Sequence, residues 1–93
     1  MKNKNILLIR KKLDKLDNNL LDIIKRRTKL VDQVIKNKRF KKEIIDKKRI
    51  AVILKSISKK SKKKNIDPKI TQKIWSSMIK AFIDYEFRNF DKK

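Results

Sequence analysis

The stretch LLDIIKRRTKLVDQVIKNK, residues 20–38, decides the fold because its apolar residues return every three or four positions. This spacing places them along one face of an α-helix. The same alternation of three- and four-residue steps begins at Ile9 and ends at Val34, and neither Gly nor Pro interrupts residues 6–38. We therefore predict one long helix over residues 6–38, roughly 50 Å in length at 1.5 Å per residue.

A helix of this length is too long for its own chain to cover. A compact monomer of 93 residues is only about 30 Å across by the scaling of the radius of gyration. The apolar seam would extend beyond the rest of the molecule, so we expect it to pack against a second copy in a two-fold homodimer.

A second, shorter helix is expected in the middle of the chain. The largely polar stretch over residues 37–42 allows a turn, and the apolar positions between Ile45 and Ile57 return at helical spacing. The lysine-rich run SKKSKKKN, residues 58–65, is the best candidate for the following loop.

A third helix is expected to complete the chain. Asp67 suits the N-cap position and Pro68 the first helical position, and apolar residues then recur as far as Phe90. No segment alternates apolar and polar residues as a half-buried strand does. We predict an all-α chain of three helices that forms a single domain over residues 1–93.

The composition excludes much of enzyme chemistry. The chain has no Cys and no His, and so lacks a thiolate nucleophile, the usual general base and the commonest metal ligand. It has no Gly with which to build a phosphate-cradling loop. The four-residue apolar run near the N-terminus is shorter than a signal peptide requires, and no segment reaches transmembrane length. We expect a cytoplasmic protein with no membrane partner.

The net charge of +20 raises the question of nucleic-acid binding. Lys, Ile and Asn, all with A/T-rich codons, supply 46 of the 93 residues, so an A/T-rich genome offers another explanation for the charge. No aromatic residues are interleaved with the lysines of residues 59–64, which argues against a base-stacking surface. Nucleic-acid binding remains the alternative from a non-enzyme class, beside a catalytically inactive structural dimer.

Three charged residues occupy positions that the helical pattern assigns to the core. Arg27 falls in the seam of the long helix, Lys38 lies about 20° away on the same face, and Glu86 lies among apolar residues of the third helix. A buried charge without a partner costs several kcal/mol. Arg27 and Glu86 could form an internal salt bridge, or the long side chains could extend to solvent. Alternatively, these residues line a cationic cavity for an anionic molecule, for which the planar guanidinium of Arg is well suited.

Arg10 bears on the same question through its distance from Arg27. The two residues are 17 positions apart, roughly 25 Å along one helix. Both can contact one small ligand only if Arg10 comes from an antiparallel partner chain.

The charged residues also follow a specific order and spacing over most of the chain. The pattern consists of RKKLDKLDNNLLDIIKRR (residues 10–27), Lys38, Asp46-x-x-Arg49, and Glu86 within WSSMIKAFIDYEFRNF (residues 75–90). It resembles the all-helical, AroQ-type chorismate mutases over about residues 6–90. The resemblance implies an intertwined homodimer of three-helix chains that rearranges chorismate to prephenate, in aromatic amino-acid synthesis, without a cofactor or a covalent intermediate.

The resemblance also implies a role for each charged position. Arg27, and Arg10 from the other chain, would bind the two carboxylates of chorismate, and Arg49 would support the carboxylate end. Lys38 would donate a hydrogen bond to the ether oxygen, where negative charge develops.

Two acidic residues complete this implied site. Asp46 would accept a hydrogen bond from the ring hydroxyl, and Glu86 would be a second donor to the ether oxygen. Glu86 can donate only when protonated, which its apolar neighbours favour and the nearby Lys38 and Arg27 oppose.

The sequence departs from the family pattern at two positions. Ile50 stands where many mutases have a Glu that helps hold the substrate hydroxyl, and Phe82 stands where some have Ser. An aliphatic residue at position 50 is also found in the related isochorismate pyruvate-lyases, which are the alternative enzyme on this fold. Retention of Asp46 favours the mutase.

Overall fold

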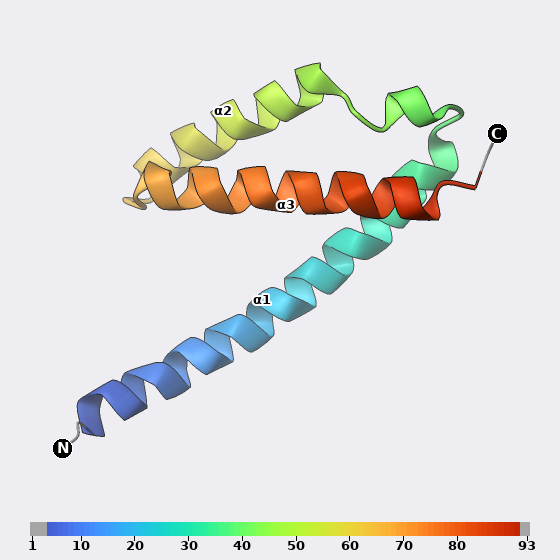
Figure 1. The fold of residues 1–93 in the computed structure, drawn as a ribbon. Helices are drawn as coiled ribbons and strands as arrows, with labels where there is room; N and C mark the ends of the chain where they lie inside the picture. The colour runs from blue at the N-terminus through green and yellow to red at the C-terminus, as the bar shows by residue number, and fades with distance from the viewer. Residues whose placement is uncertain (1–3, 92–93) are drawn as a thin grey trace. The chain divides into compact units, whose positions relative to one another are not determined.

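The computed structural model describes residues 4–91, and Figure 1 labels its helices. In that range the chain forms four helical elements and no strand: α1 (Lys4–Asn37), the 3-10 helix η1 (Lys41–Glu43), α2 (Lys47–Lys63) and α3 (Pro68–Asn89). The all-α class and the three main helices are confirmed. The chain divides into two compact units, one ending at Leu30 and one beginning at Val31. Within residues 4–91, no helix combines the length and apolar character needed to cross a membrane.

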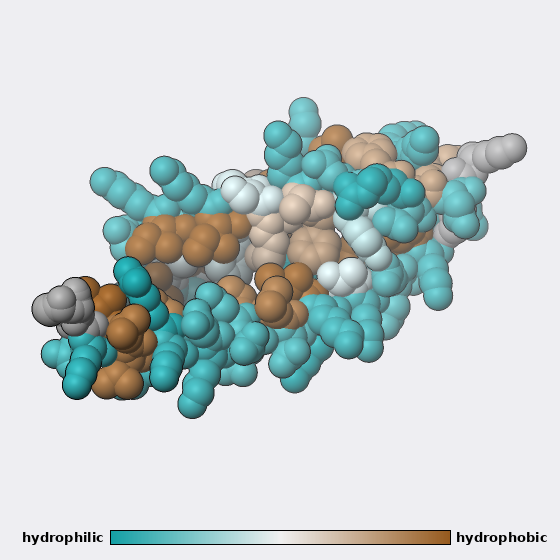
Figure 2. Space-filling model, turned by 60° about the horizontal axis from the view of Figure 1, so that its bottom comes forward, coloured by the Kyte–Doolittle hydropathy of each residue, from teal (hydrophilic) through white to brown (hydrophobic). Residues whose placement is uncertain are grey.

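The first unit is formed by α1 up to Leu30, and its apolar seam is exposed. Each of the following seam residues leaves more than half of its surface exposed: Ile9, Leu13, Leu16, Leu20, Ile23 and Leu30. In the space-filling view of Figure 2, apolar side chains (brown) gather at the surface between hydrophilic ones (teal). Burying one such side chain contributes about 1.5–3 kcal/mol, so covering the seam would stabilise the protein considerably.

In the second unit, α2 and α3 lie side by side as a helical hairpin (Figure 1). The loop between them is shorter than the sequence suggested, because residues 58–63 continue α2. The prediction of a loop over residues 58–65 was wrong for these six residues. Lysine is a good helix former, and its charge is favourable near a helix C-terminus. Since this run contains neither Gly nor Pro, nothing in it ends the helix early.

The helix α2 ends where Asn65 adopts a left-handed backbone conformation, with φ of 59°. The backbone N–H of Asn65 donates to the carbonyl oxygen of Lys62 at 3.2 Å, and that of Ile66 donates to Ser61 at 2.8 Å. These two bonds form a Schellman motif. Asn tolerates the left-handed region better than most other residues, so it ends the helix in a chain without glycine.

The start of α3 agrees with the sequence prediction. The side chain of Asp67 caps the helix by accepting a hydrogen bond from the backbone N–H of Lys69 at 2.9 Å, and Pro68 is the first helical residue. Close to this loop, the buried hydroxyl groups of Ser61 and Thr71 lie 2.8 Å apart and join the end of α2 to the start of α3.

A small core joins the end of α1 to the end of α3. Its buried residues are Ile35 from α1, Ile44 from the segment before α2, and Phe90 at the end of α3. Val31, Ile83 and Tyr85 pack around them, partly buried. This core brings the C-terminal turns of α1 and α3 together and so positions the charged residues beside them.

Candidate functional site

The ends of α1 and α3 carry an ion pair. Lys38 follows the last residue of α1, and its ammonium Nζ donates to Glu86 Oε1 at 3.0 Å and to the carbonyl oxygen of Ile44 at 3.5 Å. Glu86 lies on α3 and is only 8% exposed. A buried carboxylate is costly unless it is paired and hydrogen-bonded. The ion pair with Lys38 therefore offsets the cost of burying Glu86 on the apolar face of α3.

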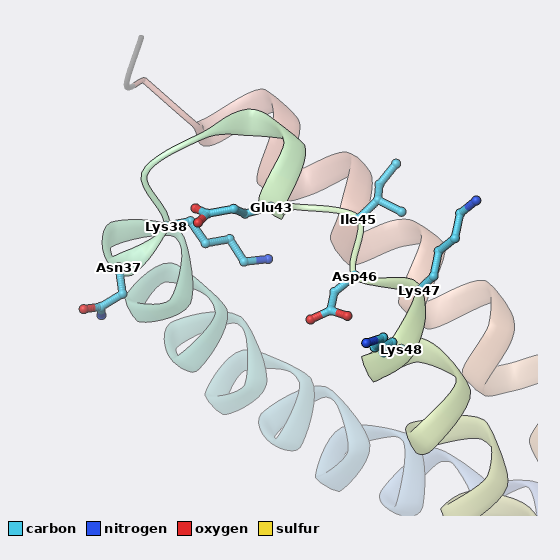
Figure 3. Close-up of a pocket in the computed structure, with 7 residues that line it drawn as sticks. All are labelled: Asn37, Lys38, Glu43, Ile45, Asp46, Lys47 and Lys48. Carbon is cyan, nitrogen blue, oxygen red and sulfur yellow. The ribbon is translucent and has the colours of Figure 1, made fainter.

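An open cavity of about 550 Å³ lies beside Lys38 (Figure 3). Figure 3 shows the Lys38 side chain and the Asp46 carboxylate directed toward the space between the end of α1 and the start of α2, while Asn37 and Lys47 point away. The lining consists of Asn37, Lys38, Glu43, Ile45, Asp46, Lys47 and Lys48, and the groups directed into the space include the Lys38 ammonium and the Asp46 carboxylate. The cavity thus offers donors for an anion and acceptors for a hydroxyl group.

Asp46 is the N-cap of α2, and this gives the Asp46-x-x-Arg49 spacing a structural cause. Its Oδ1 atom accepts a hydrogen bond from the backbone N–H of Arg49 at 3.0 Å. A carboxylate has several acceptor positions, so Asp46 can cap the helix and still accept from a ligand. The side chain of Arg49 is exposed, and within residues 4–91 Arg49 is not part of the cavity lining.

Arg10 and Arg27 both lie on α1, in the first unit. Arg27 is half-buried and Arg10 is exposed. Because α1 is continuous over both positions, their Cα atoms are about 25 Å apart along the helix axis. One chain therefore does not bring Arg10 and Arg27 to a common small ligand.

The family model for chorismate mutase type II matches residues 9–87, from α1 into α3. The chain belongs to the chorismate mutase type II family. Comparisons with curated proteins and with solved structures gave no match. Membership of this family supports chorismate mutase activity in general, that is, an isomerase acting on chorismate. Lys38, Asp46 and Glu86 all fall inside the matched range.

In this member of the chorismate mutase type II family, the two departures from the usual pattern lie on α2 and α3. Ile50 and Phe82 are both half-buried. The ring of Phe82 contacts that of Tyr85 edge to face, with the centroids 6.4 Å apart and an angle of 79°. Both side chains are apolar, so neither can donate or accept a side-chain hydrogen bond at its position.

Glu43 lines the cavity and was missed by sequence reasoning. Its Oε2 atom accepts hydrogen bonds from the backbone N–H groups of Phe40, at 3.1 Å, and Arg39, at 2.6 Å. These two bonds, first that of Phe40 and then that of Arg39, hold the pKa of Glu43 below its usual value of 4.5. Glu43 thereby fixes the turn that directly follows Lys38. The available signal was the three-residue spacing from Phe40 to an acidic residue, as at a helix N-terminus.

Asp32 and Tyr85 form a second polar contact between α1 and α3 that the sequence did not reveal. The hydroxyl of Tyr85 donates to Asp32 Oδ1 at 2.7 Å, and both residues are half-buried. The hydrogen bond to Asp32, together with burial, raises the pKa of Tyr85 above its ordinary value of 10.0. The two residues are 53 positions apart, so no local pattern links them.

Within residues 4–91, no group of three or more His, Cys, Asp or Glu residues lies in an arrangement that could hold a metal ion.

Proposed function

We propose that this protein catalyses the rearrangement of chorismate to prephenate, and that residues 1–93 act as one chorismate mutase domain. The observation that carries this proposal is the ammonium group of Lys38, held by Glu86 at 3.0 Å beside a cavity, in a chain of this family. The reaction is an isomerisation in which an ether C–O bond breaks as a C–C bond forms. It requires no nucleophile and no cofactor, in keeping with a chain that has no Cys and no His.

Lys38 is proposed to supply the main electrostatic contribution. Negative charge grows on the ether oxygen in the transition state, and a fixed donor at that atom lowers the barrier more than it stabilises the bound substrate. The bonds from Lys38 Nζ to Glu86 and to the Ile44 carbonyl restrict where the ammonium can lie. Such restriction is the preorganisation that this form of catalysis needs.

The carboxylates of chorismate are proposed to bind Arg27 and the partner subunit's Arg10, with Arg49 supporting one of them. The support for a shared site is the length of α1, which separates Arg10 from Arg27 in one chain, and the exposed seam, which a second copy would cover. Holding both carboxylates would keep the substrate in the folded shape from which the new bond forms. Asp46, at the cavity, is the proposed acceptor for the ring hydroxyl.

The central test is a turnover assay with both candidate substrates. We expect the purified protein to consume chorismate and to form prephenate. The alternative, an isochorismate pyruvate-lyase, is favoured by Ile50 and predicts salicylate and pyruvate from isochorismate. Formation of these products without turnover of chorismate would move the assignment to the lyase, and turnover of neither substrate would reject both.

Glu86 is proposed to assist Lys38 at the ether oxygen, and this requires a proton. In the structure its Oε1 atom accepts from Lys38, whereas toward the substrate it must donate. The Glu86→Gln variant carries an amide that donates at any pH, so its rate should depend less on pH than that of the wild type. The measurement is the pH profile of kcat for both proteins. An identical profile in the variant would show that Glu86 does not act as a hydrogen-bond donor to the ether oxygen.

A further inference from the structure

The contact between α1 and α3 depends on a small number of groups. In the described part of the chain, only Ile35, Ile44 and Phe90 are buried apolar residues. A contact with only three buried apolar residues leaves α3 some freedom to rotate or slide along α1. The polar contacts between the same helices, Tyr85 with Asp32 and Glu86 with Lys38, therefore have a larger share in fixing their register.

On α3, the two polar contacts are made by successive residues, Tyr85 and Glu86. Tyr85 packs against the small core, and Glu86 follows it. A rotation of α3 that breaks the bond from the Tyr85 hydroxyl to Asp32 would also move the carboxylate of Glu86, because consecutive helical residues share one rigid backbone. The charged groups that face Tyr85 are Asp32 from α1, at 2.7 Å from the hydroxyl, and Arg88 of α3, 6.0 Å from the ring centroid.

We propose that Tyr85 is a positioning residue whose hydrogen bond to Asp32 holds α3 in the register that brings Glu86 to Lys38. The inference rests on the proposed function, since it is through Lys38 and Glu86 that the register affects the rate. Tyr85 itself does not contact the substrate. Its loss should therefore lower kcat and leave KM nearly unchanged, because the groups that it positions act on the transition state.

The first arm of the test measures the hydrogen bond without any use of activity. Tyr85 is the only tyrosine of the chain, so a spectrophotometric titration reports on this one hydroxyl. We expect it to ionise above the ordinary pKa of 10.0, because Asp32 stabilises the neutral form. The Asp32→Ala variant should bring the titration back toward the ordinary value. Titration of the wild type at the ordinary value would overturn the inference whatever the enzyme does.

The second arm measures the consequence for catalysis. Tyr85→Phe removes one oxygen and retains the ring in the core, and we expect kcat to fall about tenfold, less than the ~10²-fold that a 1 Å displacement can cost. Asp32→Asn should keep most of the rate, since its amide oxygen still accepts from the hydroxyl, whereas Asp32→Ala should match Tyr85→Phe. The double variant Tyr85→Phe/Asp32→Ala should be no slower than either single variant, because both remove the same bond.

Thr71→Val is the matched control for a general loss of stability. It removes a hydroxyl from the 2.8 Å contact between Thr71 and Ser61, which joins α2 to α3 away from the Lys38–Glu86 pair. We expect it to lower the melting temperature and to leave kcat unchanged. A kcat of Tyr85→Phe within twofold of the wild type, or a fall equal to that of Thr71→Val, would overturn the inference while chorismate turnover by the wild type upholds the proposed function. Absence of turnover in the wild type would reject the proposed function and this inference with it.

Discussion

Replacing Lys38 with Ala should lower kcat by about 10²–10³-fold, the loss that follows removal of a single donor to a developing oxyanion. The ammonium group lies 3.0 Å from Glu86 and beside the cavity, and no other lysine of the lining has such a partner among the contacts described for residues 4–91. KM should change much less, because the interaction is made mainly in the transition state. Steady-state kinetics with chorismate, together with far-ultraviolet circular dichroism, measure the rate and the retained helicity.

The Lys38→Ala variant has a second effect that must be separated from the first. It leaves the buried carboxylate of Glu86 without its ammonium partner, and breaking a buried pair can cost about 3–5 kcal/mol. The cost should lie toward the lower end, since the Lys38 side chain is 20% exposed. The double variant Lys38→Ala/Glu86→Gln removes this unpaired charge, so it should regain stability and remain slow.

Lys41→Ala provides the control for charge. Lys41 is an exposed residue of η1 outside the cavity lining, so this variant loses the same charge three positions away and should keep the wild-type rate. Near-full activity of Lys38→Ala, or recovery of the rate in the double variant, would show that Lys38 does not act on the ether oxygen.

Two inactive variants should restore each other's activity when they are refolded together. Arg10→Ala and Lys38→Ala should each be nearly inactive alone. In a mixed dimer, one site combines the Lys38 and Arg27 of one chain with the Arg10 of the other, and this site is complete. Random pairing makes about half of the dimers mixed, each with one intact site of two, so about a quarter of the wild-type activity should return. The measurement is chorismate turnover after co-refolding from denaturant in equal amounts.

The pair Arg27→Ala and Lys38→Ala is the matched control for this experiment. Both residues belong to the same chain's half of the proposed site, so each site of the mixed dimer lacks one of them and no activity should return. Sedimentation analysis should show dimers in both mixtures. Dimers without recovered activity in the Arg10 mixture would show that Arg10 does not act across the interface, and monomers throughout would reject the shared site itself.

Local physical chemistry made most of the helical structure predictable. The apolar spacing between Ile9 and Val34, without Gly or Pro, predicted α1 within two residues at its start and one at its end. Asp67 and Pro68 marked the start of α3, because capping depends only on residues a few positions apart. The expectation of a loop was wrong for residues 58–63, which continue α2, because lysine supports a helix.

The sequence by itself determined that Lys38 and Glu86 occupy positions where charges are unusual, because helical periodicity assigns each residue to a face. Only the tertiary structure decided that these two form a pair at 3.0 Å, that Glu43 fixes the turn directly after Lys38, and that Tyr85 bonds to Asp32. The pairs Lys38–Glu86 and Asp32–Tyr85 span 48 and 53 positions, and their geometry depends on how α3 packs against the end of α1. Periodicity fixes the direction of a side chain on its own helix, whereas packing fixes which side chain of another helix it meets.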